Sequence, residues 1–382
     1  SFFFFGFWIY FALPQWPLGD IASGTGALPW DLTMGSNYQD HIMGVFWAAF
    51  LLFAWTAASI VSGAVIERIR TGAFLILAVL VGSITWVIDA AWGWSPTGWM
   101  VTELGYHDAY ASGVIHGICG GAALGILVHL GPRIGKFAPD GTPRNINPHN
   151  PWFAVIGLFI IYAGFWGFYA ACNVPILDFT GDGSVFTATT IYLTPTTLST
   201  ITFNFLLSLA GGLLAGYTLS KGDAYWTFSG GLAGIIAASA GNDLYHPLQA
   251  FFIAIVGVWI AYRMHFWVER KFKIDDAVGA VAVPGYAGSF GVIICGFMLW
   301  GYPSLADGSV TINPLGQIIG AIIMFVVLGF IPTYIVAGIL KAMGVLRIPR
   351  ELELAGLDYI EEQTLDADSK EIKDAELAEV NN

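Results

Sequence analysis

Apolar residues along this chain gather in long runs separated by short polar segments. Each run holds roughly 20 residues, the length that an α-helix rising 1.5 Å per residue needs to cross a bilayer. The runs lie at about 1–17, 41–66, 72–95, 108–131, 151–172, 196–220, 225–242, 248–268, 277–302 and 313–343. Outer-membrane barrels instead show alternating segments of roughly ten residues. The pattern therefore predicts an all-α polytopic membrane protein with ten transmembrane helices.

Composition agrees with this interpretation, since 56% of the 382 residues are hydrophobic and 11% are charged. A soluble domain carries about 25% charged residues. Beyond Arg347 the chain becomes abruptly acidic, which predicts a transmembrane domain over 1–345 and a solvated tail over 346–382. This tail accounts for part of the net charge of −12, and nucleic acid is an implausible partner.

Sequence signatures of an enzyme are missing from the chain. Its three cysteines, Cys119, Cys172 and Cys295, lie far apart and form no CxxC pair. We find no nucleotide-binding loop, haem-ligand pair or catalytic triad. The sequence thus gives no reason to expect a cofactor, a metal site or enzymatic activity.

Positive charges indicate the orientation in the membrane. They fall in or beside alternate loops and the tail, at Arg68, Arg70, Arg133, Lys136, Arg144, Lys221, Arg263, Arg270, Lys271, Lys273, Lys341, Arg347 and Arg350. The positive-inside rule makes those loops and the carboxyl terminus cytoplasmic, most simply at a bacterial inner membrane. With ten spans and a cytoplasmic carboxyl terminus, residue 1 would also lie on the cytoplasmic side. The opening SFFFFGFWIY does not resemble a natural amino terminus, so we expect an upstream piece.

Polar residues inside the apolar runs are costly and so become functional candidates. His116 lies near the middle of its run, and Asp108 precedes it by eight residues, about 12 Å further out on the same side of a helix. Asp89 and Trp92 close the preceding run, where a carboxylate and an indole could border a mouth for a cation. These residues also have structural interpretations: His116 as a buried core histidine, Asp108 as a helix cap and Trp92 as an interfacial tryptophan. Together they indicate a channel or transporter for something small.

Six segments together resemble the ammonium transporter and Rhesus channel family. They are GAVIERIR (63–70), DAYASGVIH (108–116), YAGFWGFYA (162–170), SGGLAGIIA (229–237), IDDAVGAVAVPGYAGSFG (274–291) and LRIPRELELAGLD (346–358), in the family order. The family has eleven helices and an outside amino terminus. The resemblance therefore implies that this chain corresponds to helices two to eleven.

The resemblance also implies roles for individual residues. Phe53 and Phe168 would form a stacked phenyl gate, and His116 would be the first of two paired pore histidines. Trp92 would help to form the outer ammonium-recruiting site, with Asp108 as its supporting carboxylate. Cys172 falls where the family commonly offers a serine hydroxyl, and a thiol is a poorer hydrogen-bond acceptor.

The sequence departs from the family pattern at the second pore histidine, where it has Pro284. A proline supplies no imidazole, lacks a backbone donor and kinks a helix. His116 then needs another hydrogen-bonding partner, for which water, Asn204 and Tyr169 are candidates.

Three functions remain open at this stage. The first is ammonium or ammonia transport through a pore in each subunit, for nitrogen uptake; the second is transport of another small amine or neutral solute; the third is a non-conducting sensor or structural subunit. Conduction predicts a hydratable path around His116, whereas a non-conducting role predicts that Pro284, Tyr286 or a phenyl ring fills it. By resemblance the protein would be a homotrimer, with a PII-type regulator near the tail segment 346–358.

Overall fold

Helices make up most of the molecule. The computed structural model describes residues 1–22, 41–177 and 186–356. In chain order the helices are η1 (Phe2–Gly6), α1 (Phe7–Ala12), α2 (His41–Val65), α3 (Thr71–Leu80), η4 (Val81–Thr85), α4 (Trp86–Gly93), α5 (Trp99–Leu104), η5 (Ser112–Gly117), α6 (Ile118–Leu130), α7 (Pro151–Ala171), α8 (Leu198–Ser220), α9 (Ala224–Ser239), α10 (Pro247–Phe272), η6 (Val281–Tyr286), α11 (Ala287–Met298), α12 (Pro314–Ile322), η7 (Ile323–Phe330), α13 (Ile331–Ala342) and α14 (Arg350–Ala355). The η elements are short π-helical segments, each continuous with an α-helix.

Every predicted apolar run contains a helix. Among the described residues, eight continuous helical segments are long and apolar enough to cross a membrane: Phe46–Val65, Thr71–Gly93, Ser112–Leu130, Pro151–Ala171, Leu198–Ser220, Pro247–Phe272, Val281–Met298 and Pro314–Ala342. The other two runs, 1–17 and 225–242, form the shorter helices Phe2–Ala12 and α9. The all-α prediction is confirmed, and most helix ends fall within a few residues of the predicted ones.

Local sequence explains why several of these helices begin where they do. Side chains immediately before α7, α8, α9 and α12 accept a hydrogen bond from a backbone N–H of the first turn, which would otherwise have no partner. The capping residues are Asn150, Thr197, Asp223 and Asn313. Before α10, His246 and Gln249 form a reciprocal capping pair, and Pro247 takes the first helical position.

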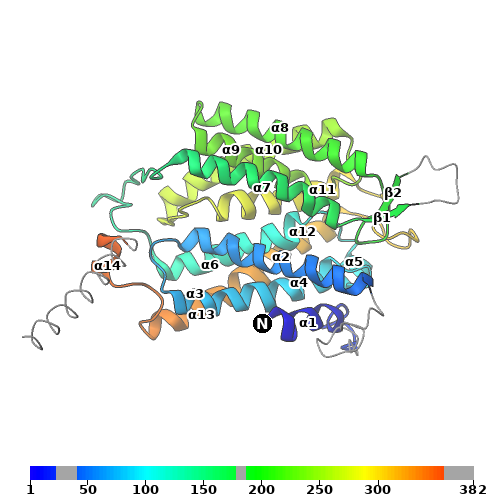
Figure 1. Cartoon of the computed structure of the whole chain (residues 1–382), viewed down its shortest axis with the longest axis horizontal. Helices are drawn as coiled ribbons and strands as arrows, with labels where there is room; N and C mark the ends of the chain where they lie inside the picture. Colours follow the sequence, from blue (N-terminus) through cyan, green and yellow to red (C-terminus); the bar gives the residue numbers. More distant parts are fainter. Residues whose placement is uncertain (23–40, 178–185, 357–382) are drawn as a thin grey trace, which may run out of the picture.

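The long helices lie side by side along one axis (Figure 1). A small antiparallel sheet, formed by β1 (Val174–Leu177), β2 (Phe186–Thr189) and β3 (Pro195–Thr196), lies at one end, and α14 lies at the other. We call these the strand end and the α14 end. The sheet was not predicted from the apolar pattern.

Glycines allow some helices to approach until their backbones touch. A Cβ atom at Gly120 on α6 would overlap the Cα of Gly285 on η6. Gly212 on α8 and Gly230 on α9 meet in the same way. Between membrane helices, where apolar packing gains nothing over lipid, such close contacts are a main source of cohesion.

Candidate functional site

Three aromatic side chains come together in the strand-end half of the bundle. The ring centroids of Phe53 on α2 and Phe168 on α7 lie 4.9 Å apart, with an interplanar angle of 72°. The two rings are in contact as predicted, but edge to face and not as a parallel stack. Trp94, directly after α4, lies 5.2 Å from Phe53 and stacks on Phe168 at 6.1 Å. Its indole N–H donates to the carbonyl of Asp108 at 2.9 Å, which fixes the ring.

Trp92, the predicted member of this group, lies elsewhere. Its ring is 6.0 Å from Trp16 and 5.5 Å from Trp99, nearer the surface of the strand end. Trp94 is therefore the indole that the structure brings to the phenyl pair. The sequence offers two indoles two residues apart, Trp92 and Trp94, at the end of this run, and the resemblance selected the first.

Asp108 is fully buried and caps the amino end of η5. Its carboxylate accepts backbone N–H groups of Ser112, Gly113 and Val114 at 2.7, 2.7 and 3.0 Å. The Tyr106 hydroxyl donates a fourth hydrogen bond at 3.1 Å. The capping interpretation is thus confirmed, and the same carboxylate fixes the helix that carries His116.

Cys172 closes the carboxyl end of α7, one turn beyond Phe168. Its backbone N–H donates to the Phe168 carbonyl at 3.0 Å, and its free thiol is buried. The residue therefore lies on the strand-end side of the phenyl pair, where the resemblance places a polar group.

His116 lies in η5, beneath the phenyl pair, and is buried. Its ring stacks on Phe165 with a centroid distance of 5.2 Å and an interplanar angle of 14°. Phe165 in turn lies 5.2 Å from Phe168. Within the described residues neither ring nitrogen of His116 has a hydrogen-bonding partner. Trp94, Phe53, Phe168, Phe165 and His116 form a continuous set of contacts, which we call the aromatic column.

Two of the partners predicted for His116, Asn204 and Tyr169, form no hydrogen bond with its ring. Asn204 donates to the carbonyls of Asn242 and Tyr245. The Tyr169 hydroxyl bonds the Ser239 hydroxyl at 2.6 Å and accepts from the Asn242 amide. Each of these side chains completes a junction between helices.

Pro284 is buried in η6, at the position predicted for the second histidine. The next residue, Gly285, touches Gly120, so proline occupies a tight helix crossing. Tyr286, a candidate for blocking the path, stacks instead on Phe325. Phe165 is the phenyl ring that covers His116.

Ser289 on α11 was missed by the sequence analysis. Its hydroxyl is buried and has no hydrogen-bonding partner among the described residues. It lies beside Gly117, the residue after His116, because a Cβ atom at Gly117 would be 3.8 Å from this hydroxyl. A second unpartnered polar group therefore lies close to His116.

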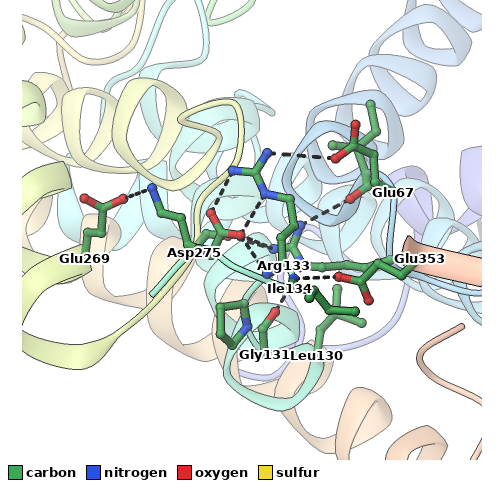
Figure 2. Close-up of polar contacts among 12 residues, drawn as sticks. Glu67, Leu130, Gly131, Arg133, Ile134, Glu269, Asp275 and Glu353 are labelled. Carbon is green, nitrogen blue, oxygen red and sulfur yellow. Dashed lines mark hydrogen bonds and ion pairs between the residues drawn. The ribbon is translucent and has the colours of Figure 1, made fainter. Parts of the chain in front are cut away.

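The α14 end holds a different kind of polar cluster (Figure 2). Arg68 is fully buried and donates to the carbonyls of Asp275 at 2.7 Å and Gly131 at 3.0 Å. Arg133 binds both carboxylate oxygens of Asp275, at 2.8 and 2.9 Å (Figure 2). Lys136 pairs with Glu269. We call this group of charged residues, with Arg347 and Glu353, the ionic cluster.

The tail segment joins the same cluster. Arg347 donates to the Glu353 carboxylate at 2.8 Å and to the carbonyls of Leu130 and Pro132. Glu353, on α14, also accepts the backbone N–H of Ile134 at 2.8 Å (Figure 2). The beginning of the predicted tail is therefore tied to the loop that follows α6.

A bundle of membrane-length helices that encloses aromatic rings leading to a buried histidine has the arrangement of a membrane channel or transporter. The comparisons with known proteins narrow this class. The chain belongs to the Ammonium Transporter Family, whose model matches residues 1–366. It is thus an integral membrane protein of a family of transporters, and not an enzyme.

Similar sequences include two archaeal proteins. The chain is 33% identical to "Ammonium transporter Amt2" of Methanocaldococcus jannaschii over 342 residues, covering 87% of this chain and 73% of that protein. The protein of the same name from Archaeoglobus fulgidus is 32% identical, with 89% and 73% covered. Among solved structures, "Sensor Amt Protein" matches with a TM-score of 0.76 at 26% identity, covering 94% of this chain and 85% of that one. Saccharomyces cerevisiae Mep2, at 17% identity and a TM-score of 0.70, shares the fold; the match covers 92% of this chain and 77% of that one.

Proposed function

We propose that this protein transports ammonium, as the ion or as ammonia, through a path along the aromatic column. The observation that carries the proposal is the continuous series of contacts from Trp94 through the phenyl pair to His116. The family match and the names of its archaeal relatives support the choice of substrate.

The entry to this path lies at the strand end. The face of an indole attracts a cation, and Trp94 offers one next to the phenyl pair. Asp108 is saturated with hydrogen bonds, so its contribution is to fix η5 and to add negative charge nearby, not to bind the ion directly. Cys172 borders the same entry with a weak acceptor. We assign Trp92 to the surface around this entry.

Past the entry the path is apolar and narrow. Phe53 and Phe168 must rotate for anything to pass, and their rings give no hydrogen bonds to a hydrated ion. Beyond them, His116 and Ser289 offer the unpartnered polar groups that a small nitrogen compound could use. Because Pro284 stands at the position of the second histidine, His116 would be the single imidazole along the path.

The remaining features of the assembly follow from family resemblance and charge. The α14 end, which carries the Arg and Lys residues of the ionic cluster, would face the cytoplasm. Its tail segment from residue 346 would be the docking region for a PII-type regulator, and the membrane domain would end near residue 345. Large apolar side chains are exposed on α7, α8 and α10, including Phe153, Ile160, Phe203, Phe252 and Trp259. These faces suit lipid and neighbouring copies in a homotrimer within a bacterial plasma membrane.

The test is ammonium-evoked current together with uptake of radiolabelled methylammonium, in proteoliposomes that contain the full chain. We expect saturable uptake, reduced at least about tenfold by Trp94→Ala, as loss of roughly 1.4 kcal/mol of binding would give. Trp92→Ala is the matched control, since the same side chain is removed two residues away, and uptake should change less than twofold.

Two results would argue against this assignment. Equal losses in the two tryptophan variants would remove the reason to place the entry at Trp94. Absence of both current and uptake in the unaltered chain would argue for a changed substrate or a non-conducting role.

A further inference from the structure

Asp89 is the buried carboxylate that the proposed path does not use. It lies on α4, in the strand-end half of the segment Thr71–Gly93, and its side chain is fully buried. Neither carboxylate oxygen has a hydrogen-bonding partner among the residues described by the structure. A carboxylate is expensive to bury as an ion without a partner, so an unpartnered one within a span is either protonated or a candidate site for a cation.

Other polar atoms on the same helix share this condition. Within the described part of the chain, the Thr85 hydroxyl and the indole N–H groups of Trp86 and Trp92 are also buried without partners. Thr85, Asp89 and Trp92 are spaced i, i+4 and i+7, which places them on one face of the helix. A stripe of unused polar atoms therefore runs from Trp92 at the strand end inward to Thr85.

This stripe faces away from the aromatic column. Gly93, one turn after Asp89 on the same face, contacts the ring of Tyr106 and the methyl of Met324. α4 packs there against η5 and η7. Trp94 follows Asp89 by five positions, about 140° around a helix with 100° per residue, and reaches the phenyl pair instead. Asp89 thus lies behind η5, on the opposite side from Phe165.

Neighbouring carboxylates show that the strand end can satisfy buried charge with protein groups. Asp108 has four donors, and Asp243 pairs with the His107 ring at 3.0 Å, both completely enclosed. Among these three carboxylates, Asp89 alone lacks protein donors in the described chain. Its missing partner is therefore a property of this position and not of the region.

The groups around Asp89 suit a small nitrogen cation. Its two carboxylate oxygens and the Thr85 hydroxyl, one turn away on the same face of the helix, can accept N–H groups. Calcium takes six to eight oxygen ligands and magnesium an octahedral set, more than these side chains supply. A monovalent ammonium-type cation satisfies the carboxylate with fewer oxygens.

We propose that Asp89 and Thr85 form a second cation site, which binds ammonium or a monosubstituted ammonium ion behind the proposed path. Trp92 lies at its strand-end side. The proposal rests on the proposed function for the choice of ligand, and the site itself rests on the unpartnered groups of this helix.

The experiment counts bound ions. Binding of radiolabelled methylammonium to the full chain is measured by scintillation proximity, at constant ionic strength, with ammonium chloride and potassium chloride as competitors. We expect two ions per chain in the unaltered protein and one in Asp89→Asn. Thr85→Val should weaken methylammonium binding at the Asp89 site at least tenfold. This variant tests the same site if Asp89→Asn does not reach the membrane. Asp307→Asn, which neutralises an exposed carboxylate, is the matched control and should bind two ions.

The outcomes separate this inference from the proposed function. Two ions bound in both Asp89→Asn and Thr85→Val would overturn the site, and so would displacement by potassium as effective as by ammonium. Loss of one bound ion in Asp89→Asn, together with uptake that Trp94→Ala still reduces, would support both the second site and the proposed transport. Absence of uptake with binding at the Asp89 site intact would overturn transport and leave the site standing. A chain that binds no methylammonium would overturn both.

Discussion

Two sets of buried ionisable groups in the bundle differ in their partners. In the ionic cluster at the α14 end, Arg68 and Arg133 both donate to Asp275, and Arg347 is paired with Glu353. Toward the strand end, Asp89 and His116 are buried with no partner in the described residues. The paired groups join separate segments of the chain, whereas the unpartnered groups are the ones to which we assign a ligand in our proposals.

Charge states at the α14 end follow from this pairing. Burial lowers the pKa of Arg68 to about 10, although the charge of Asp275 opposes the change. Burial alone would raise the pKa of Asp275, but hydrogen bonds and charge from Arg133, with the charge of Arg68, hold it below its ordinary value. Both groups are therefore charged at neutral pH, and Arg68 and Asp275 form an ion pair.

The largest effect is expected from removing the centre of the ionic cluster. Asp275→Ala leaves Arg68 buried without its countercharge, and breaking a buried pair in this way costs about 3–5 kcal/mol. We expect a clear loss of thermal stability of the full chain in detergent. Asp307→Ala, at an exposed carboxylate, serves as the control. Equal melting temperatures for the two variants would show that the cluster does not hold the α14 end.

The next effect concerns His116, a buried group without a hydrogen-bonding partner among the described residues. His116→Ala removes a buried ring that makes no hydrogen bond, so the cost is the contact with Phe165, about 1 kcal/mol, together with the cavity that the ring leaves, and we expect the chain to stay folded. Methylammonium uptake should nevertheless fall at least about tenfold, equivalent to 1.4 kcal/mol. Uptake at the unaltered level would remove His116 from the path, and severe unfolding would make it a structural residue.

A smaller effect is expected where the tail joins the ionic cluster. Glu353→Gln weakens the contacts to Arg347 and to the Ile134 N–H, and hydrogen bonds to charged groups contribute about 1.5–3 kcal/mol. Because only the tail is released, we expect faster amide hydrogen exchange in α14 with little change in the melting temperature. Glu351→Gln, at an exposed position in the same helix, is the matched control. Identical exchange in the two variants would contradict the docking role of Glu353.

The smallest effect is a dependence of stability on pH. The folded pKa of Asp275 lies below the unfolded value of about 3.9, so its contribution is complete above that value and disappears as pH falls through the folded pKa. The stability difference between the unaltered chain and Asp275→Asn should thus be constant from pH 7 to about pH 5 and shrink below about pH 4. If this stability difference instead grew as the pH fell, the Asp275 carboxylate would not be stabilised by its pairing with the two arginines.

Much of the fold follows from the apolar runs because a bilayer imposes both length and hydrophobicity on every span. Run 151–172 matches Pro151–Ala171 closely, since Asn150 and Pro151 mark the start of α7. Run 277–302 begins too early, because the Asp276 carboxylate accepts the N–H groups of Val281 and Ala282 and the helical segment starts there. The short sheet at the strand end has no signal of this kind.

Prediction of the site was less complete for a geometric reason. The spacing of Asp108 and His116 predicts one helix over both residues, but the helical segment begins at Ser112, and Asp108 caps it from the preceding loop. The choice between Trp92 and Trp94 does not follow from spacing, because two residues correspond to about 200° around a helix and periodicity cannot say which ring faces α2 and α7. The stacking of Phe165 on His116 joins different helices, so it could be seen only in the folded chain.

The contact between Gly120 and Gly285 has a consequence for how fast material can move. Gly120 lies near the middle of the span Ser112–Leu130, and there α6 and η6 touch through their backbones. Separating these helices at that depth would lose the close backbone contact that holds them together. Rotation of side chains along the proposed path leaves this contact in place. We therefore expect transport to be limited by side-chain motion and not by a slower movement of whole helices.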